Sequence, residues 1–109
     1  MKSRIVYLEL KTHRGGHDDN GPAWITKVTF SKTGKTIYWR GKKLQRAKMI
    51  YGNHRDANTG EECWISGPKK DGQDRYPWAG EKIRIDPDVR KEYWRDIRKQ
   101  PERSNERFA

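Results

Sequence analysis

The strongest constraint on the fold is a two-residue alternation of apolar and polar side chains that ends at a tight turn. Residues 24–31 read WITKVTFS, which puts Trp24, Val28 and Phe30 on one face. Side chains of a β-strand point alternately to opposite faces, so this pattern predicts a half-buried strand. The turn sequence Ser31-Lys32-Thr33-Gly34 comes directly after Phe30. Glycine can adopt the positive φ that a hairpin turn requires. The segment therefore predicts the first half of an antiparallel hairpin.

The rest of the chain predicts a small, mainly β domain. Further short strands are expected at residues 4–11, 35–40, 43–46, 50–55, 62–66 and 82–85, separated by loops rich in Gly, Pro and Asp. Asp86 and Pro87 suit the N-cap and first position of a helix, which is predicted to run to about Lys99. Residues 1–100 are interpreted as one α+β domain, mainly β: a curled antiparallel sheet or SH3-like barrel of five to six strands with one C-terminal helix. Residues 101–109 are expected to be a frayed tail.

Positive charge is concentrated in one part of the chain. The formal net charge is +10, and residues 20–55 contribute +9 of it because they contain no Asp or Glu. The same segment holds Trp24, Tyr38, Trp39 and Tyr51. Cations clustered in this way create a local positive field, which favours a polyanionic partner.

The predicted hairpin places part of this charge on one exposed face. If the face with Trp24 packs inward, then Lys27, Tyr38 and Arg40 point outward on the two strands. Lys and Arg neutralise phosphates, and an exposed Tyr can stack an unpaired base. The predicted nucleic-acid-binding residues, for RNA or DNA, are Lys27, Tyr38, Arg40, Lys42, Lys43 and Arg46. The alternative is a solvated sheet face whose lysines provide solubility.

A protein-interaction module is a second hypothesis. Small β-barrels bind extended peptides through aromatic grooves or free sheet edges. Trp39, Trp64, Tyr76 and Trp78 could line such a groove, and an acidic peptide would match the charge of the chain. The competing interpretation of these aromatic residues is core packing, because the chain contains only three Leu.

Two clusters contain residue types that could support chemistry. His13, His17 and the two aspartates that follow could bind a divalent metal, although a flexible polar loop is the commoner meaning of such a sequence. Cys63 and His54 could form an activated thiolate pair, against the ordinary interpretation of a small buried thiol. The predicted function is non-enzymatic, with no catalytic residue, metal or cofactor.

The same composition suggests a cytoplasmic setting. A single cysteine rules out an intrachain disulfide framework and fits a reducing compartment. The N-terminal MKSRIVYLELK lacks the long apolar region of a signal peptide, and no apolar run approaches the length of a membrane span. Membrane association is therefore not expected.

Three stretches of the chain resemble a group of small bacterial proteins of about this length. They are GPAWITKVTFSKTGKTIYWRGK (21–42), TGEECWISGPKKDGQDR (59–75) and IDPDVRKEYWRDIR (85–98), about half the chain. The group has no established activity, so the resemblance implies no catalytic residues. Some of its members are labelled deoxyxylulose-phosphate synthase. That enzyme is a large thiamine-diphosphate protein, and 109 residues cannot house its two cofactor-binding domains.

Overall fold

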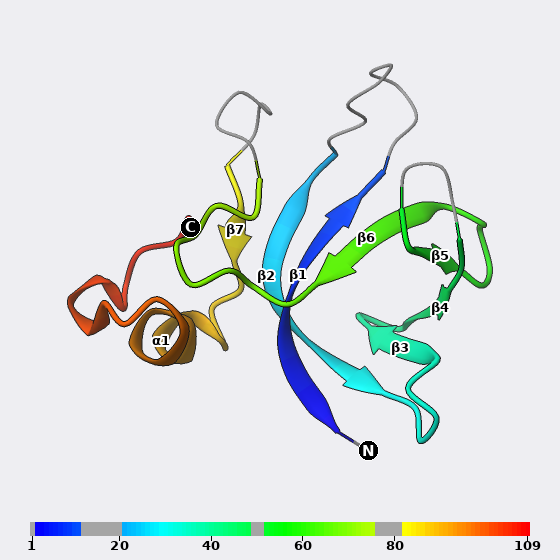
Figure 1. The fold of residues 1–109 in the computed structure, drawn as a ribbon, viewed down its shortest axis with the longest axis horizontal. Helices are drawn as coiled ribbons and strands as arrows, with labels where there is room; N and C mark the ends of the chain where they lie inside the picture. The colour runs from blue at the N-terminus through cyan, green and yellow to red at the C-terminus, as the bar shows by residue number, and fades with distance from the viewer. Residues whose placement is uncertain (1, 12–20, 49–51, 76–81) are drawn as a thin grey trace.

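The computed structural model describes residues 2–11, 21–48, 52–75 and 82–109. Within them the chain forms a closed barrel of six antiparallel strands, a seventh strand outside it and a short C-terminal helix, which confirms the predicted mainly β fold (Figure 1). The strands are β1 (Ser3–Leu10), β2 (Ala23–Phe30), β3 (Thr36–Trp39), β4 (Lys42–Arg46), β5 (His54–Asp56), β6 (Glu62–Ser66) and β7 (Arg84–Ile85). Their order is β1-β6-β5-β4-β3-β2-β7, and pairing between β1 and β2 closes the barrel.

The predicted hairpin forms between β2 and β3. Phe30 pairs with Ile37, and Gly34 adopts a φ of 75° in the turn between the strands. A second tight turn joins β3 to β4, where Trp39 pairs with Lys42 and Arg40 has a φ of 48°. Arg40 and Gly41, the two central residues of this turn, both have a positive φ, and such turns match the right-handed twist of the flanking strands. Consecutive short hairpins thus bend the chain round into a barrel.

The barrel interior is filled by the inward side chains of its strands. The buried cluster consists of Val6, Leu8, Val28, Ile37, Trp39, Leu44, Cys63 and Ile65, with Leu10, Trp24 and Phe30 packed against it. Trp39 is only 4% exposed, so its ring occupies core volume in a chain that has few aliphatic residues. The hydrophobic alternation read from the sequence is therefore the alternation between inside and outside of this barrel.

A second core lies outside the barrel, against β1 and β2. It is formed by Ile5, Tyr7, Ala23 and Ile25 on the strands and by residues in and next to β7 and the helical segment, which are Ile83, Ile85, Val89, Tyr93 and Trp94. The helix therefore covers the outer face of this strand pair, on the side opposite β3, β4 and β5 (Figure 1). β1 is consequently buried on both faces from residue 5 to residue 9.

The helical segment differs from the prediction at its start. It begins with α1 (Arg90–Glu92) and continues as the π-helix η2 (Tyr93–Ile97). Its N-cap is Val89, which makes no side-chain cap bond. The Asp86 carboxylate accepts hydrogen bonds from Thr26 and Arg40 instead. The prediction of Asp86 as N-cap was therefore wrong, because tertiary partners take its oxygens.

The C-terminal residues pack back onto the domain, where the sequence predicted fraying. After the 3₁₀ turn η3 (Pro101–Arg103), the indole N–H of Trp94 donates to the carbonyl oxygen of Glu106 at 3.0 Å. The backbone N–H of Ile85 donates to Arg107, and that of Ala109 donates to Ile83. The free edge of β7 and the buried indole supply polar groups that this segment satisfies. Among the described residues, no helix has the length and apolarity needed to cross a membrane.

Candidate nucleic-acid interface

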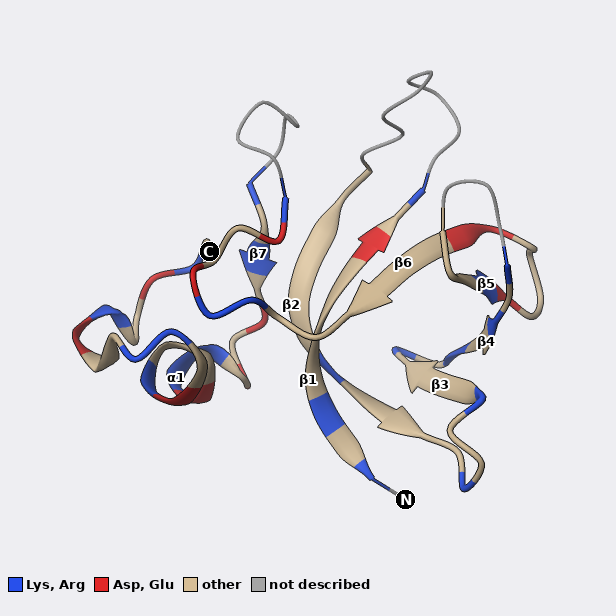
Figure 2. Cartoon of the chain, viewed as in Figure 1, with Lys and Arg blue, Asp and Glu red and all other residues tan. Residues whose placement is uncertain are grey.

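The structure does not place the six predicted binding residues on one face. They lie in three places: Lys27, Tyr38 and Lys43 on the outer face of the barrel, Arg40 and Lys42 at the end near Trp39, and Arg46 at the opposite end. Figure 2 shows that Lys and Arg as a whole are also spread out, along β4, on β5 and near the start of β1. Strand parity predicted which face of a strand each residue occupies, but it did not predict at which end of the barrel the residue lies.

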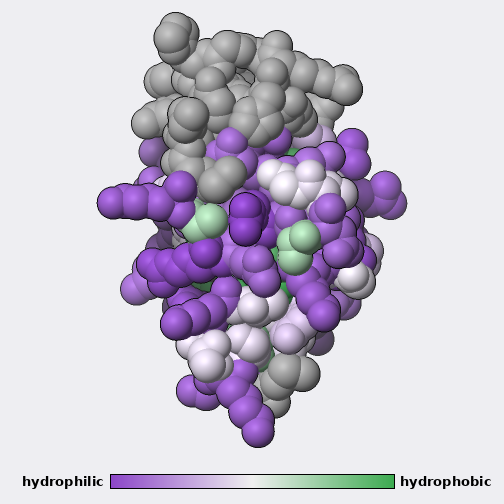
Figure 3. All heavy atoms as spheres, turned by 90° about the vertical axis from the view of Figure 1, so that its right-hand side faces the viewer, coloured by the Kyte–Doolittle hydropathy of each residue, from purple (hydrophilic) through white to green (hydrophobic). Residues whose placement is uncertain are grey.

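The outer face carries a modest basic surface. Tyr38 lies between Thr29 of β2 and Lys43 of β4 in the strand register, and Lys27 is on the same face of β2. Arg55 of β5, which the predicted site leaves out, extends this surface and is exposed. Figure 3 views the molecule from the side of β3, β4 and β5 and shows mostly hydrophilic side chains there. The outer face is therefore a polar surface that carries exposed cations.

At one end of the barrel, two predicted residues are engaged within the protein. The guanidinium carbon of Arg40 lies 4.6 Å from the ring centroid of Trp39 and 5.2 Å from that of Trp24. Its Nη2 donates to Asp86 Oδ1 at 2.8 Å. Lys42 Nζ lies 5.8 Å from the Trp39 ring. An ion pair with Asp86 reduces the attraction of Arg40 for a phosphate, so this end is the weaker candidate for anion binding.

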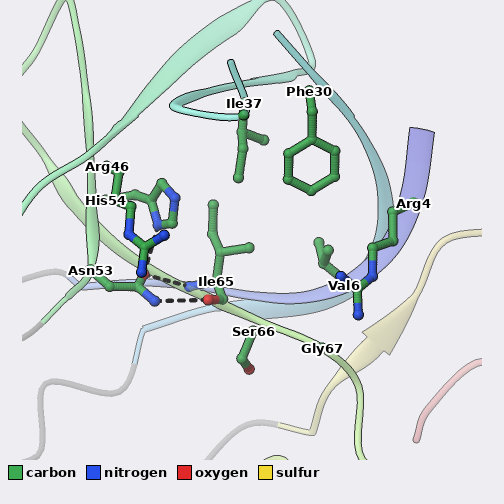
Figure 4. A pocket seen from close by; sticks show the side chains of 11 residues that line it. Arg4, Val6, Phe30, Ile37, Arg46, Asn53, His54, Ile65, Ser66 and Gly67 are labelled. Atoms are coloured by element: carbon green, nitrogen blue, oxygen red, sulfur yellow. Dashed lines mark hydrogen bonds between the residues drawn. The ribbon is translucent and has the colours of Figure 1, made fainter. Parts of the chain in front are cut away.

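The opposite end of the barrel is hollow (Figure 4). A cavity of about 220 Å³ opens there, and its apolar wall is made by Val6, Phe30, Ile37 and Ile65. Arg4 lies on one side of the space, with Arg46 and His54 on the other (Figure 4). The cavity thus combines an apolar interior with cations at its rim.

A second hollow adjoins the first between the start of β1 and the β2–β3 turn. The two share Arg4, Phe30 and Gly34 in their linings, and the second adds Lys2 and Lys32. We call the combined surface the basic mouth, and its cations are Lys2, Arg4, Lys32 and Arg46. Among the described residues, none that lines either hollow is Asp or Glu, and none of the ion pairs involves these four cations. Their charge is therefore available to an external anion.

Hydrogen bonds fix the tautomer of His54 in the basic mouth. The Asn53 amide is held in one orientation, because its Nδ2 donates to the Ile65 carbonyl oxygen at 2.8 Å and its Oδ1 accepts the Ile65 N–H at 2.9 Å. His54 Nδ1 lies 2.8 Å from that Oδ1 and must therefore be the donor. Burial, and secondly the charge of Arg46, lowers the pKa of His54 below its ordinary value of 6.5. The ring is then neutral at pH 7, with Nε2 as an acceptor.

The environment of Cys63 favours the unreactive thiol. Cys63 pairs with His54 across β5 and β6 and belongs to the barrel core, where it is 1% exposed. Burial, and secondly the negative charge of Asp56, raises its pKa to about 12. The thiolate is the nucleophilic form, so this position does not supply an activated nucleophile at neutral pH.

Two of the four aromatic residues of the peptide hypothesis differ in exposure. Trp39 is buried in the barrel, while Trp64 on β6 is 42% exposed. Tyr76 and Trp78 lie outside the described residues, as does the predicted metal loop with His13 and His17. Among the described residues, no group of three or more His, Cys, Asp or Glu could hold a metal.

The basic mouth contains four basic or titratable residues that the predicted site lacks, which are Lys2, Arg4, Lys32 and His54. Arg4 shares strand parity with Val6, which was a usable signal for the inward face. Its approach to Arg46 depends on barrel closure, which the sequence pattern does not encode. The chain matches no protein-family model, no curated protein and no solved structure. The interpretation of the site therefore depends on its geometry and charge.

Proposed function

We propose that this chain is a non-enzymatic nucleic-acid-binding module whose binding surface is the basic mouth. The observation that carries the proposal is the gathering of Lys2, Arg4, Lys32 and Arg46 around two adjoining hollows in which no acidic residue competes for them among the described residues. Cations in such an arrangement neutralise phosphates and release condensed counterions, which is the main source of affinity for nucleic acids.

The cations of the outer face would give weaker, auxiliary attraction. Lys27, Lys43 and Arg55 are exposed on β2, β4 and β5, so they raise the positive potential on that side of the barrel. The cations of the basic mouth are equally exposed, but they surround two adjoining hollows that can hold a strand. The proposal therefore assigns direct phosphate contacts to the basic mouth.

The test is fluorescence anisotropy with labelled single-stranded RNA, single-stranded DNA and duplex DNA, each titrated at low and physiological salt. Heparin serves as a control for general polyanion affinity. The double variant Arg4→Gln, Arg46→Gln should weaken binding about tenfold or more at low salt. It should also reduce the slope of log K against log salt by about 1.4, since each phosphate contact on a single strand contributes about 0.7.

Two further double variants remove the same amount of charge elsewhere. Lys91→Gln with Arg95→Gln changes exposed cations of the helical segment and should leave the affinity within about twofold. Lys27→Gln with Lys43→Gln changes the outer face. A larger loss of affinity with this pair than with the Arg4 and Arg46 pair would show that the nucleic acid binds at the outer face instead. Weak, salt-insensitive binding to every oligonucleotide would refute the proposal.

An acidic peptide is the alternative partner that the same cations would suit. A titration with labelled polyglutamate of matched charge distinguishes the two. Tighter binding to polyglutamate than to any nucleic acid would favour the peptide-binding alternative.

A further inference from the structure

We propose that the barrel cavity of the basic mouth receives one unpaired base, so that the module selects single-stranded nucleic acid over duplex. This inference rests on the proposed function and adds the class of nucleic acid and the place where the base binds.

The position of the cavity excludes a paired base. It lies within the end of the barrel, where the side chains of Phe30, Ile37 and Ile65 face the same space (Figure 4). Bases in a duplex are stacked and paired, so a protein reaches their edges only from the grooves. A base of a single strand can be splayed out of the stack and inserted into a recess. The cavity therefore suits a base that has left its neighbours.

The wall offers a surface suited to a flat, heteroaromatic ring. Phe30 is half-buried, whereas Val6, Ile37 and Ile65 are almost fully covered by their neighbours. Part of the Phe30 ring therefore remains accessible at the cavity that it lines. Stacking on such a ring tolerates every base, because each base has a π-face.

The polar groups of the cavity complement the edge of a base. His54 Nδ1 is committed to Asn53, and no hydrogen bond among the described residues uses His54 Nε2. This acceptor can take an N–H of a base, and each base carries at least one such donor on its pairing edge. Arg46, on the same side of the cavity, supplies donors for a base carbonyl or a phosphate.

The cations are arranged to hold the chain on both sides of an inserted base. Arg4 and Arg46 lie on opposite sides of the cavity (Figure 4). Lys2 and Lys32 line the adjoining hollow, which continues from Arg4 and Phe30. Phosphates flanking the base would thus meet cations whichever strand direction is bound.

The experiment compares three oligonucleotides of equal length: a single strand, the same strand in a duplex, and a single strand with abasic sites throughout. The abasic strand keeps the phosphates and loses every base. We expect the intact single strand to bind about tenfold or more tightly than either of the others, in line with stacking measured at aromatic residues. Equal affinity for the intact and abasic strands would overturn the inference but would leave phosphate binding, and so the proposed function, standing.

Two variants locate the base. Phe30→Leu keeps apolar volume in the wall and removes the ring. It should weaken the affinity for the intact strand about fivefold or more and leave the affinity for the abasic strand unchanged. Tyr38→Leu removes the aromatic ring of the outer face. If Tyr38→Leu weakens binding and Phe30→Leu does not, the base stacks outside the barrel and the inference is wrong. Circular dichroism and thermal melting confirm that each variant is folded. If the unmodified protein bound none of the three oligonucleotides, the proposed function itself would be refuted.

Discussion

The hydroxyl of Thr26 donates a hydrogen bond to Asp86 Oδ2 at 2.6 Å, across 60 residues of sequence. Thr26 is 2% exposed, and its oxygen also accepts the indole N–H of Trp39 at 2.9 Å. The barrel interior is thereby connected through two hydrogen bonds to the segment that precedes the helix. This connection explains why the Asp86 side chain does not cap that helix.

Replacing Thr26 by Val should destabilise the fold by about 1–3 kcal/mol, because the shape is kept while the buried indole N–H of Trp39 loses its acceptor. The free energy of unfolding in urea measures this cost. Arg40→Ala is the comparison variant. The Arg40 side chain is 47% exposed, so loss of its ion pair with Asp86 should cost less than about 1 kcal/mol. Equal stability of Thr26→Val and the unmodified protein would contradict a structural role for the connection.

Cys63 should resist alkylation while the protein is folded. Burial raises its pKa to about 12, so the reactive thiolate is scarce at pH 8 and the sulfur is covered. Iodoacetamide labelling followed by mass spectrometry should give almost no adduct in buffer and complete labelling in concentrated urea. Rapid labelling of the folded protein would instead revive the hypothesis of a Cys63–His54 pair.

Stability should fall as the pH drops below the ordinary pKa of histidine. The pKa of His54 is lowered in the folded state, so the unfolded chain binds its proton first. The contribution of His54 is therefore complete above pH 6.5 and is lost from there down to the folded-state pKa, below which it is constant. One proton can change the free energy of unfolding by at most about 1.4 kcal/mol per pH unit.

The matched variants for this prediction are His54→Gln and Arg46→Gln. Subtracting the pH profile of His54→Gln from that of the unmodified protein should isolate the loss between pH 6.5 and the folded-state pKa. Arg46→Gln should raise the pKa of His54, because the charge of Arg46 is the second cause of its depression. NMR titration of the imidazole measures this directly, and an unchanged pKa would argue against proximity of the two residues.

Gly52 should tolerate no side chain. A Cβ at this position would overlap the backbone carbonyl of Cys63 on β6. We expect Gly52→Ala to cost about 1–3 kcal/mol or more, since backbone atoms of a barrel strand cannot move aside without breaking its pairing. Thermal melting compares it with Gly60→Ala.

The comparison at Gly60 separates crowding from backbone strain. A Cβ there would meet no atom within 4 Å, but its φ of 76° disfavours other residues. That strain is worth about 1–2 kcal/mol, and Gly60→Asn should recover part of it because Asn tolerates this conformation. A Gly52→Ala variant as stable as the unmodified protein would show that the approach of Gly52 to Cys63 is looser than described.

Local pattern explains which parts of this fold could be predicted from the sequence. The alternation that puts Val28 and Phe30 on one face is a property of neighbouring residues, and it survives in the barrel as inside and outside. The turn at Gly34 is equally local, because a positive φ is decided by the residue itself. The concentration of cations in residues 20–55 is likewise a property of the chain before it folds.

Which of these residues lie close together depends on pairing between strands that are distant in the sequence. β1 pairs with both β2 and β6, and this closure brings Arg4 to the cavity that Arg46 and His54 also line. The folded chain also brings Thr26 and Arg40 within hydrogen-bond distance of the Asp86 carboxylate. Strand parity specifies a face but no position around or along a barrel, because that position depends on pairing between distant strands. Local sequence pattern therefore specifies a basic, mainly β chain with inward and outward faces. Only barrel closure, driven by burial of the inward faces, selected the mouth at which its cations converge.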